Sequence, residues 1–266
     1  MNKANRFFYI LLLPLLLYPY LGNTQENKIL LEADFEDHLD QGLTKDLIND
    51  PHIDRVQGAG PDGSAAIRVD YEGYDRGSKR VIEKHRFGAR VEKATLSFDV
   101  CFDHAFQWVR GGKLHGLGPR RTVTGGSQRR PDGWSARIVF KPEGACATYI
   151  YDQSMEKKWG ISDASQGAVF VPGQWHHVDF QVHLNTPGKA NGFAIIQIDG
   201  KEVVHSKNVI FRSQKGQDTL IQQFLFSTFH GGHTPPCAPV DENGDYTTIY
   251  AYFDNFLITQ GIQNNQ

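Results

Sequence analysis

The side chains best suited to chemistry lie on two segments joined by a short turn. Residues 133–140 alternate between apolar and polar side chains, a pattern typical of a β-strand. The alternation places Trp134 toward the core and puts Ser135 and Arg137 together on the opposite face. A turn centred near Glu143 follows. The segment therefore predicts the first strand of a hairpin that carries a hydroxyl and a guanidinium on one face.

The returning strand, residues 147–151, carries two tyrosines. If the turn is centred near Glu143, Tyr149 lies opposite Arg137 and Tyr151 lies opposite Ser135. Directly paired residues of an antiparallel hairpin lie about 5 Å apart. One hairpin would therefore gather a hydroxyl, a guanidinium and two phenols in one patch.

A glycine-rich segment precedes this hairpin. Residues 110–118 contain Arg110, Lys113 and His115 among several glycines. We expect this segment to bring the lysine and the histidine over the same face as the tyrosines. His115 has three interpretations: an additional acid or base in a cleft, a substrate-binding residue that shifts subsite preference, or a loop residue without a role.

These residue types suit β-elimination in a polyuronate. The reaction removes the proton at C5, next to a carboxylate, and expels the glycosidic oxygen at C4. A cation or strong hydrogen-bond donors must neutralise the carboxylate, a base must take the proton, and an acid must protonate the leaving oxygen. A tyrosine, with an unperturbed pKa of about 10, can be that base if neighbouring Lys⁺ or Arg⁺ lowers its pKa. This chemistry requires no redox cofactor and no metal.

The rest of the chain predicts an all-β domain that would position the patch. Helical periodicity is weak, and two-residue alternation recurs instead. Short strands between Gly- and Pro-rich turns predict a β-jelly roll, a two-sheet antiparallel sandwich, as a single domain over residues 25–266. Further strands are expected at 94–102, 176–184, 193–198, 220–229 and 249–258.

Two local signals refine this fold. Asp199-Gly200 between two strand-like runs is a tight hairpin signal. The opening segment 30–36 and the closing segment 252–258 are expected to pair as neighbouring strands.

The ordered motifs also resemble polysaccharide lyase family 14. The matching motifs are Gly111-Gly112-Lys113-Leu114, Trp134-Ser135-Ala136-Arg137, Tyr149-x-Tyr151 and Phe226-Ser227-Thr228-Phe229-His230-Gly231-Gly232. The resemblance covers about residues 90–258, and it implies a β-jelly-roll lyase acting on alginate or glucuronan.

The resemblance also implies roles for single residues. Lys113, Tyr149 and Tyr151 fall on the family's catalytic positions, and Ser135 and Arg137 would bind or neutralise the carboxylate. At the position of His115 the family commonly has proline, a departure that bears on substrate identity more than on reaction type.

Residues 1–24 predict an export signal. Lys3 and Arg6 precede an apolar run at 7–17. The run is short and is interrupted by Pro14, which argues against a retained membrane anchor. We therefore expect a secreted or periplasmic protein that is not bound to a membrane after removal of the signal.

The net charge of the chain limits the class of binding partner. Lys and Arg number 28 against 30 Asp and Glu, a formal net charge of −2, which argues against a general nucleic-acid binder. The expected partner is an anionic polysaccharide, alginate or glucuronan.

Three cysteines are too few for a disulfide-built scaffold. An exported protein could still pair two of Cys101, Cys146 and Cys237, and the pairing stays open.

Several residues outside the hairpin are secondary candidates. His230, at the end of the 220–229 strand, could contact sugar. A basic stretch could form a mobile lid that closes on a polyanion, or could be a solvated loop. It comprises Arg110, Arg120, Arg121, Arg129 and Arg130.

A structural calcium ion is a further candidate. Carboxylates cluster near the two paired terminal segments, and carboxylate oxygens are the ligands that Ca²⁺ prefers. They are Glu32, Glu36 and Asp254. Solvated strand-end carboxylates are the alternative.

Two other functions are compatible with a secreted β-sandwich. A non-catalytic carbohydrate-binding module or lectin would bind sugar without cleaving a bond. A glycoside hydrolase would need two carboxylates at a defined separation on one face. No Glu-x-Asp-x-x-Glu run stands in a predicted strand, and Asp99 and Asp103 alone are insufficient, so the hydrolase ranks last.

Overall fold

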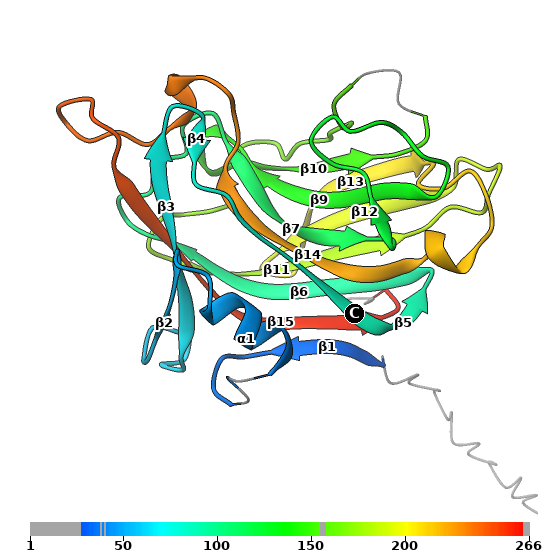
Figure 1. The fold of residues 1–266 in the computed structure, drawn as a ribbon, viewed down its shortest axis with the longest axis horizontal. Helices are drawn as coiled ribbons and strands as arrows, with labels where there is room; N and C mark the ends of the chain where they lie inside the picture. The colour runs from blue at the N-terminus through cyan, green and yellow to red at the C-terminus, as the bar shows by residue number, and fades with distance from the viewer. Residues whose placement is uncertain (1–27, 38, 40, 155–157, 263–266) are drawn as a thin grey trace, which may run out of the picture.

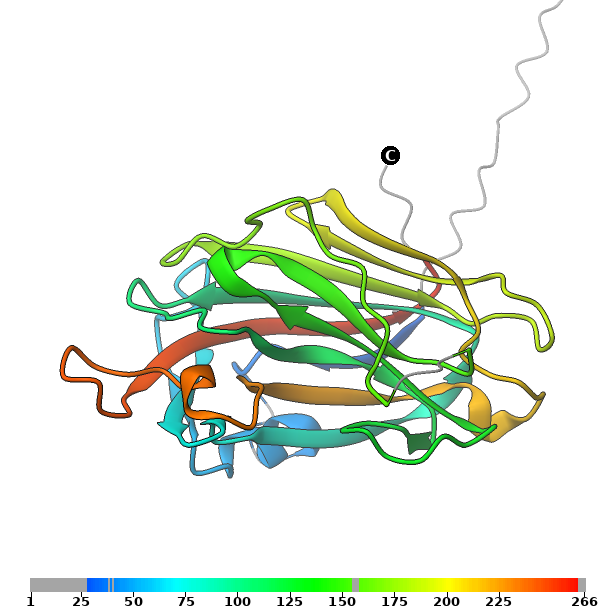
Figure 2. The ribbon, with the colours of Figure 1, turned by 90° about the horizontal axis from the view of Figure 1, so that it is seen from above.

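The computed structural model describes residues 28–37, 39, 41–154 and 158–262, and the predicted export segment lies outside them. Two sheets pack face to face, and most of their long strands run across the length of the molecule (Figure 1, Figure 2). The predicted two-sheet β-jelly roll is thereby confirmed. Within the described residues, no helix has the length and apolarity needed to cross a membrane.

The larger sheet has nine strands. Its order is β13-β12-β11-β6-β15-β3-β2, and β1 pairs with β15 while β4 pairs with β3. The strands are β1 (Ile29–Ala33), β2 (Ile53–Val56), β3 (Ala66–Tyr74), β4 (Gly77–Ser78), β6 (Lys93–Phe102), β11 (Trp175–His183), β12 (Gly192–Ile198), β13 (Lys201–Val209) and β15 (Thr248–Gln260).

The smaller sheet has six strands, and it carries the residues that the sequence singled out. Its order is β10-β9-β7-β14-β5, and the short β8 pairs with β9 in parallel. The strands are β5 (Val81–Val91), β7 (Gly112–Gly118), β8 (Arg121–Thr122), β9 (Gly133–Phe140), β10 (Cys146–Tyr151) and β14 (Ile221–His230). One short helix, α1 (Gly42–Ile48), and the 3-10 turns Pro142–Gly144, Gln217–Thr219 and Pro235–Cys237 complete the described elements.

Apolar side chains from both sheets fill the space between them. In β6 the alternate residues Leu96, Phe98, Val100 and Phe102 are fully buried in this core, as the period of two predicts. Each buried aromatic or branched side chain contributes about 1.5–3 kcal/mol relative to its exposed state. The core therefore holds the two sheets together and fixes which face of β9 points away from it.

Both local predictions about the larger sheet are confirmed. β1 pairs with β15, with Leu31 opposite Ile258. Asp199 and Gly200 join β12 to β13 with φ of 52° and 77°, the left-handed conformation that a two-residue type I′ hairpin turn requires.

Most of the glycine-rich segment 110–118 is strand β7. It runs between β9 and β14 at the centre of the smaller sheet. Two of its glycines are needed for close packing. A Cβ on Gly112 would collide with Phe140 and with the carbonyl oxygen of Phe229, and one on Gly116 would collide with the carbonyl oxygen of Ala136.

Replacing Gly116 by alanine should therefore destabilise the protein. The new methyl group would overlap the backbone of β9, and such overpacking typically costs about 1–3 kcal/mol. Chemical denaturation of Gly116→Ala should show a lower midpoint with an unchanged slope. The matched control is Gly88→Ala in β5, where nothing lies within 4 Å of the added carbon. Equal midpoints for the two variants would contradict this account of β7.

Candidate active site

The hairpin of β9 and β10 has the register that the sequence predicts. Tyr149 pairs with Arg137 and Tyr151 pairs with Ser135. Pro142–Gly144 forms the turn, and Glu143 in it has a φ of 62°. The alternation of Trp134 and its apolar neighbours into the core forces Arg137 and both tyrosines toward the other face of the sheet.

Lys113 joins this hairpin from β7. Its Nζ lies 3.4 Å from the centroid of the Tyr149 ring, so the ammonium rests on the ring face. Burial, followed by the positive charges of Arg137 and Lys141, lowers the pKa of Lys113 to about 7. A large share of Lys113 therefore carries a neutral amine near neutral pH, and a neutral amine can accept a proton.

The two tyrosines form a hydrogen-bonded pair. Their hydroxyl oxygens lie 3.3 Å apart, and the backbone N–H of Gly126 donates to the Tyr151 oxygen at 3.0 Å. Burial and the hydrogen bond with Tyr151 raise the pKa of Tyr149 to about 12. This corrects the expectation that the neighbouring cations lower the pKa of this phenol, because the loss of solvation outweighs the effect of Arg137. The Tyr149 hydroxyl is therefore protonated at neutral pH.

Arg137 supplies a positive charge beside the tyrosines. Only 9% of the residue is exposed, and its Nε has no hydrogen-bond partner in the described part of the chain. Burial lowers the pKa of Arg137 to about 10, which leaves the guanidinium protonated at neutral pH. A buried guanidinium with an unused donor is well suited to bind a carboxylate.

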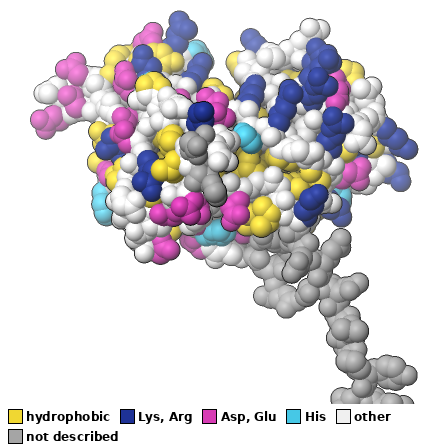
Figure 3. Space-filling view, turned by 60° about the horizontal axis from the view of Figure 1, so that its bottom comes forward, with side chains coloured by type: hydrophobic (Ala, Val, Ile, Leu, Met, Phe, Trp, Pro, Cys, Tyr) yellow, Lys and Arg dark blue, Asp and Glu magenta, His cyan; other side chains and the backbone are white. Residues whose placement is uncertain are grey.

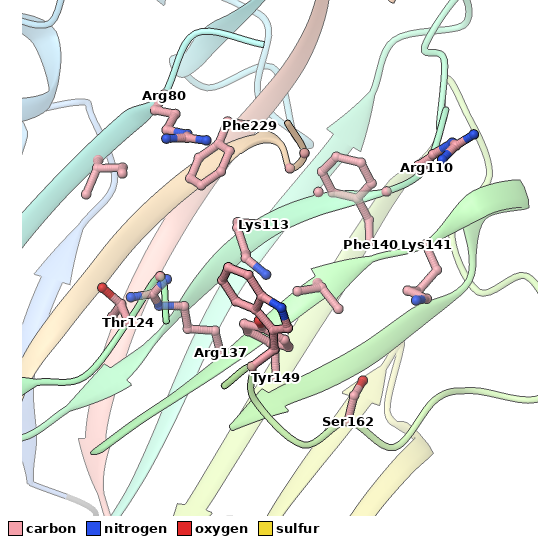
Figure 4. Close-up of a pocket in the computed structure, with 18 of the residues that line it drawn as sticks. Arg80, Arg110, Lys113, Thr124, Arg137, Phe140, Lys141, Tyr149, Ser162 and Phe229 are labelled. Atoms are coloured by element: carbon pink, nitrogen blue, oxygen red, sulfur yellow. The ribbon is translucent and has the colours of Figure 1, made fainter. Parts of the chain in front are cut away.

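These groups share one cavity of about 820 Å³ on the smaller sheet. Figure 4 shows Lys113 reaching toward Tyr149, with Arg137 on one side and Lys141 on the other. The predicted residues that line it are Arg110, Lys113, Arg137, Tyr149 and Tyr151. The cavity wall also includes Phe229 of the matching 226–232 motif, and several residues that the sequence did not single out, namely Arg80, Ile82, Lys84, Lys141, Trp159 and Ser162.

Ser135 lies beneath this site and does not line the cavity. Its side chain is fully buried, and its hydroxyl donates to the carbonyl oxygen of Val123 at 2.7 Å. In this structure the hydroxyl holds the segment that leads from β8 toward Gly126, whose N–H contacts Tyr151.

His115 points into the core, although it stands only two residues from Lys113. A register shift between Lys113 and Gly116 interrupts the pairing of β7 with β9, so simple alternation does not hold here. The imidazole is fully buried among phenylalanine rings that include Phe98 and Phe226, and burial holds its pKa well below the ordinary value. The structure therefore does not bring His115 into the cleft.

Replacing His115 by leucine should affect stability more than catalysis. Nδ1 of His115 accepts a hydrogen bond from the backbone N–H of Ser227, which the leucine would leave buried and unpaired at a cost of about 1–3 kcal/mol. We expect a lower denaturation midpoint for His115→Leu and an unchanged rate per folded molecule. His233→Leu, an exposed histidine on the cavity wall, is the control for stability. A fall in kcat larger than the loss of folded protein explains would contradict this and would make His115 a candidate acid or base again.

His230 is also buried behind the cavity. Its Nε2 lies 2.7 Å from the carbonyl oxygen of Gln107, and its ring packs on Phe106. Burial lowers the pKa of His230 to about 4. The structure places it as a packing residue at the end of β14, outside the cavity wall.

The basic stretch divides into separate parts. The guanidinium of Arg129 lies 5.1 Å from the centroid of the Tyr151 ring. Arg121 and Arg130 contact Asp132, Arg120 contacts Asp218, and Arg110 lines the cavity. Lys and Arg side chains nevertheless gather on the right half of the face in Figure 3, where acidic groups are fewer than on the left. Such a surface favours an anionic ligand.

The candidate calcium ligands do not converge. Asp254 accepts hydrogen bonds from the Ser64 hydroxyl and the Asn255 N–H, and Glu36 accepts one from the Ala65 N–H. Across the described residues, no three His, Cys, Asp or Glu side chains come together as a metal site. Cys101, Cys146 and Cys237 are buried free thiols.

Comparison with known protein families identifies the class of this protein. Residues 61–256 match the model of the family described as Polysaccharide lyase 14. The chain therefore belongs to this family, and the resemblance noted in the sequence motifs is confirmed. No curated protein matched the chain.

Solved structures share the fold. The PL-14 alginate lyase from Aplysia kurodai is 21% identical, with a TM-score of 0.63 over 88% of this chain and 100% of that one. Alginate lyase Aly36B is 23% identical, with a TM-score of 0.62 over 78% of this chain and 84% of that one. An endo-β-1,4-glucuronan lyase from Trichoderma reesei is 14% identical, with a TM-score of 0.55 over 79% of this chain and 87% of that one.

Proposed function

We propose that this lyase cleaves a polyuronate, with alginate of the poly-mannuronate type as its first substrate and glucuronan as the second, by β-elimination. The observation that carries the proposal is the position of Lys113, whose Nζ lies 3.4 Å from the Tyr149 ring centroid in a cavity shared with Arg137. A cation, a proton acceptor and a proton donor are the three groups that this elimination needs.

Arg137 begins the reaction by binding the uronate carboxylate. An ionised carboxylate makes the C5 proton a very weak acid, and charge neutralisation by the buried guanidinium stabilises the anion that forms when this proton leaves. The unpaired Nε of Arg137 supports this role, because a carboxylate would supply the missing acceptor.

Lys113 and Tyr149 move the protons. The neutral amine of Lys113 takes the proton from C5, and the electron pair of that bond forms the C4–C5 double bond. The C4–oxygen bond breaks, and the Tyr149 hydroxyl protonates the departing glycosidic oxygen. A pKa of about 7 suits the base near neutral pH, and a pKa of about 12 keeps the acid protonated. Tyr151 orients the Tyr149 hydroxyl through their hydrogen bond.

Relatives of known structure support an anionic polysaccharide substrate. A variant of Aly36B has been solved in complex with an alginate tetrasaccharide, so this fold can hold an alginate chain. Alginate and glucuronan share the C5 carboxylate that the mechanism requires, so both are tested as substrates. The apolar segment before residue 25 supports action outside the cytoplasm.

The test is to incubate the purified protein with polymannuronate, polyguluronate, glucuronan and a neutral glucan. We expect the ultraviolet absorbance of unsaturated uronate ends to grow fastest with polymannuronate and not at all with the glucan. Because every step uses a side chain of this protein, we expect the rate to persist after treatment with EDTA. Binding of the uronates without any unsaturated product would contradict the lyase and favour a lectin-like module.

A further inference from the structure

Trp159 stands out among the four tryptophans because it is exposed. It is 54% exposed and lines the cavity, whereas Trp134 is fully buried in the core. Tryptophan is highly buried on average, so an indole in the wall of a cavity indicates a contact surface.

The surroundings of the ring leave one side available. Nζ of Lys158 lies 5.1 Å from the ring centroid and covers one face. Gly126 lies at the ring edge, where a Cβ would come within 3.0 Å of Cζ3 of Trp159. These groups occupy one face and one edge of the ring, and the ring also lines the cavity.

The backbone around Trp159 is tied to the catalytic hairpin. Ile161 and Ile150 exchange two backbone hydrogen bonds of 2.9 Å each. The backbone of Gly160, the residue after Trp159, hydrogen-bonds Tyr149. The backbone beside Trp159 is therefore tied to the strand that carries Tyr149.

We propose that Trp159 forms a binding subsite for one uronate unit next to the unit being cleaved. The indole face opposite Lys158 stacks on the apolar C–H face of the sugar ring, and the Lys and Arg side chains of the cavity wall attract its carboxylate. A flat apolar surface in a cationic cavity is complementary to a uronate, which has an apolar ring face and a charged edge. The inference rests on the proposed function, since it extends the same cleft by one unit.

The test compares Trp159→Ala, Trp159→Phe and Ile161→Ala in cleavage and in binding. Loss of the stacking surface should raise KM for alginate about 2- to 12-fold, since aromatic contacts of this kind are worth about 0.5–1.5 kcal/mol. Phenylalanine should restore most of the affinity. Ile161, 39% exposed on the same segment but outside the cavity wall, is the control for a general disturbance of the loop.

Binding is measured separately with alginate tetrasaccharide in the Lys113→Met background by calorimetry. Weaker binding by Trp159→Ala, with normal binding by Ile161→Ala, supports the subsite. This holds even if the wild type releases no unsaturated ends, because missing product would refute only the lyase mechanism. Equal binding and equal KM for wild type and Trp159→Ala would overturn the subsite while leaving the lyase intact. Failure of every form to bind uronates would overturn both.

Discussion

Replacing Lys113 by methionine is expected to lower kcat on polymannuronate by about 10²- to 10⁴-fold, the usual contribution of one general base. Methionine keeps much of the apolar stem that packs against Tyr149 but removes the amine that accepts the C5 proton. Steady-state kinetics from unsaturated product formation measure the effect. The matched control is Lys84→Met, which removes another lysine from the cavity wall and should change kcat by less than about tenfold.

The same substitution should make the protein more stable. The pKa of Lys113 is lowered from 10.5 to about 7 on folding, so the folded state resists a proton that the unfolded state takes up. The resulting loss of folding stability is absent at pH values above the unfolded pKa, grows as the pH falls from about 10.5, and reaches its full size below a pH of about 7. Lys113→Met should therefore melt higher than the wild type at pH values near 6, with the difference vanishing at strongly alkaline pH. A variant that loses activity and stability together would indicate a structural lysine.

Replacing Tyr149 by phenylalanine is expected to reduce kcat by about 10²- to 10⁴-fold, because the leaving oxygen would lose its proton donor. The ring that supports Lys113 remains, so the variant removes only the hydroxyl and its hydrogen bond to Tyr151. Affinity for alginate should change little, and kcat should carry most of the effect.

Ser162→Ala removes a hydroxyl from the same cavity and serves as the control. Full activity of Tyr149→Phe would exclude this phenol as the acid. An equal loss in Ser162→Ala would show that the cavity tolerates no change, and the assignment of Tyr149 would then lack support.

The hairpin of β9 and β10 could be predicted from sequence because its register depends on local rules. Two-residue alternation in β9 and a short turn suffice to place Arg137 opposite Tyr149. The pairing of β1 with β15 also followed, since both segments carry strong strand patterns at the ends of one domain. α1 was not expected, because its seven residues are too few to establish a helical period.

The rest of the site depends on tertiary contacts that alternation does not reveal. The register shift in β7 separates Lys113 from His115, which a regular strand would place on one face. The raised pKa of Tyr149 results from burial, which only the assembled sheets create. Lys84 and Trp159 reach the cavity from elements far from each other in the chain, so no motif joins them.

The dependence of kcat/KM on pH tests the central claim most directly. If neutral Lys113 is the base, kcat/KM on polymannuronate should rise through a pKa of about 7. Lys141→Met should move this rise to higher pH, because the positive charge of Lys141 helps to lower the pKa of Lys113. A profile that is flat between pH 6 and 9, or one that Lys141→Met leaves in place, would contradict the assignment of Lys113 as the proton acceptor.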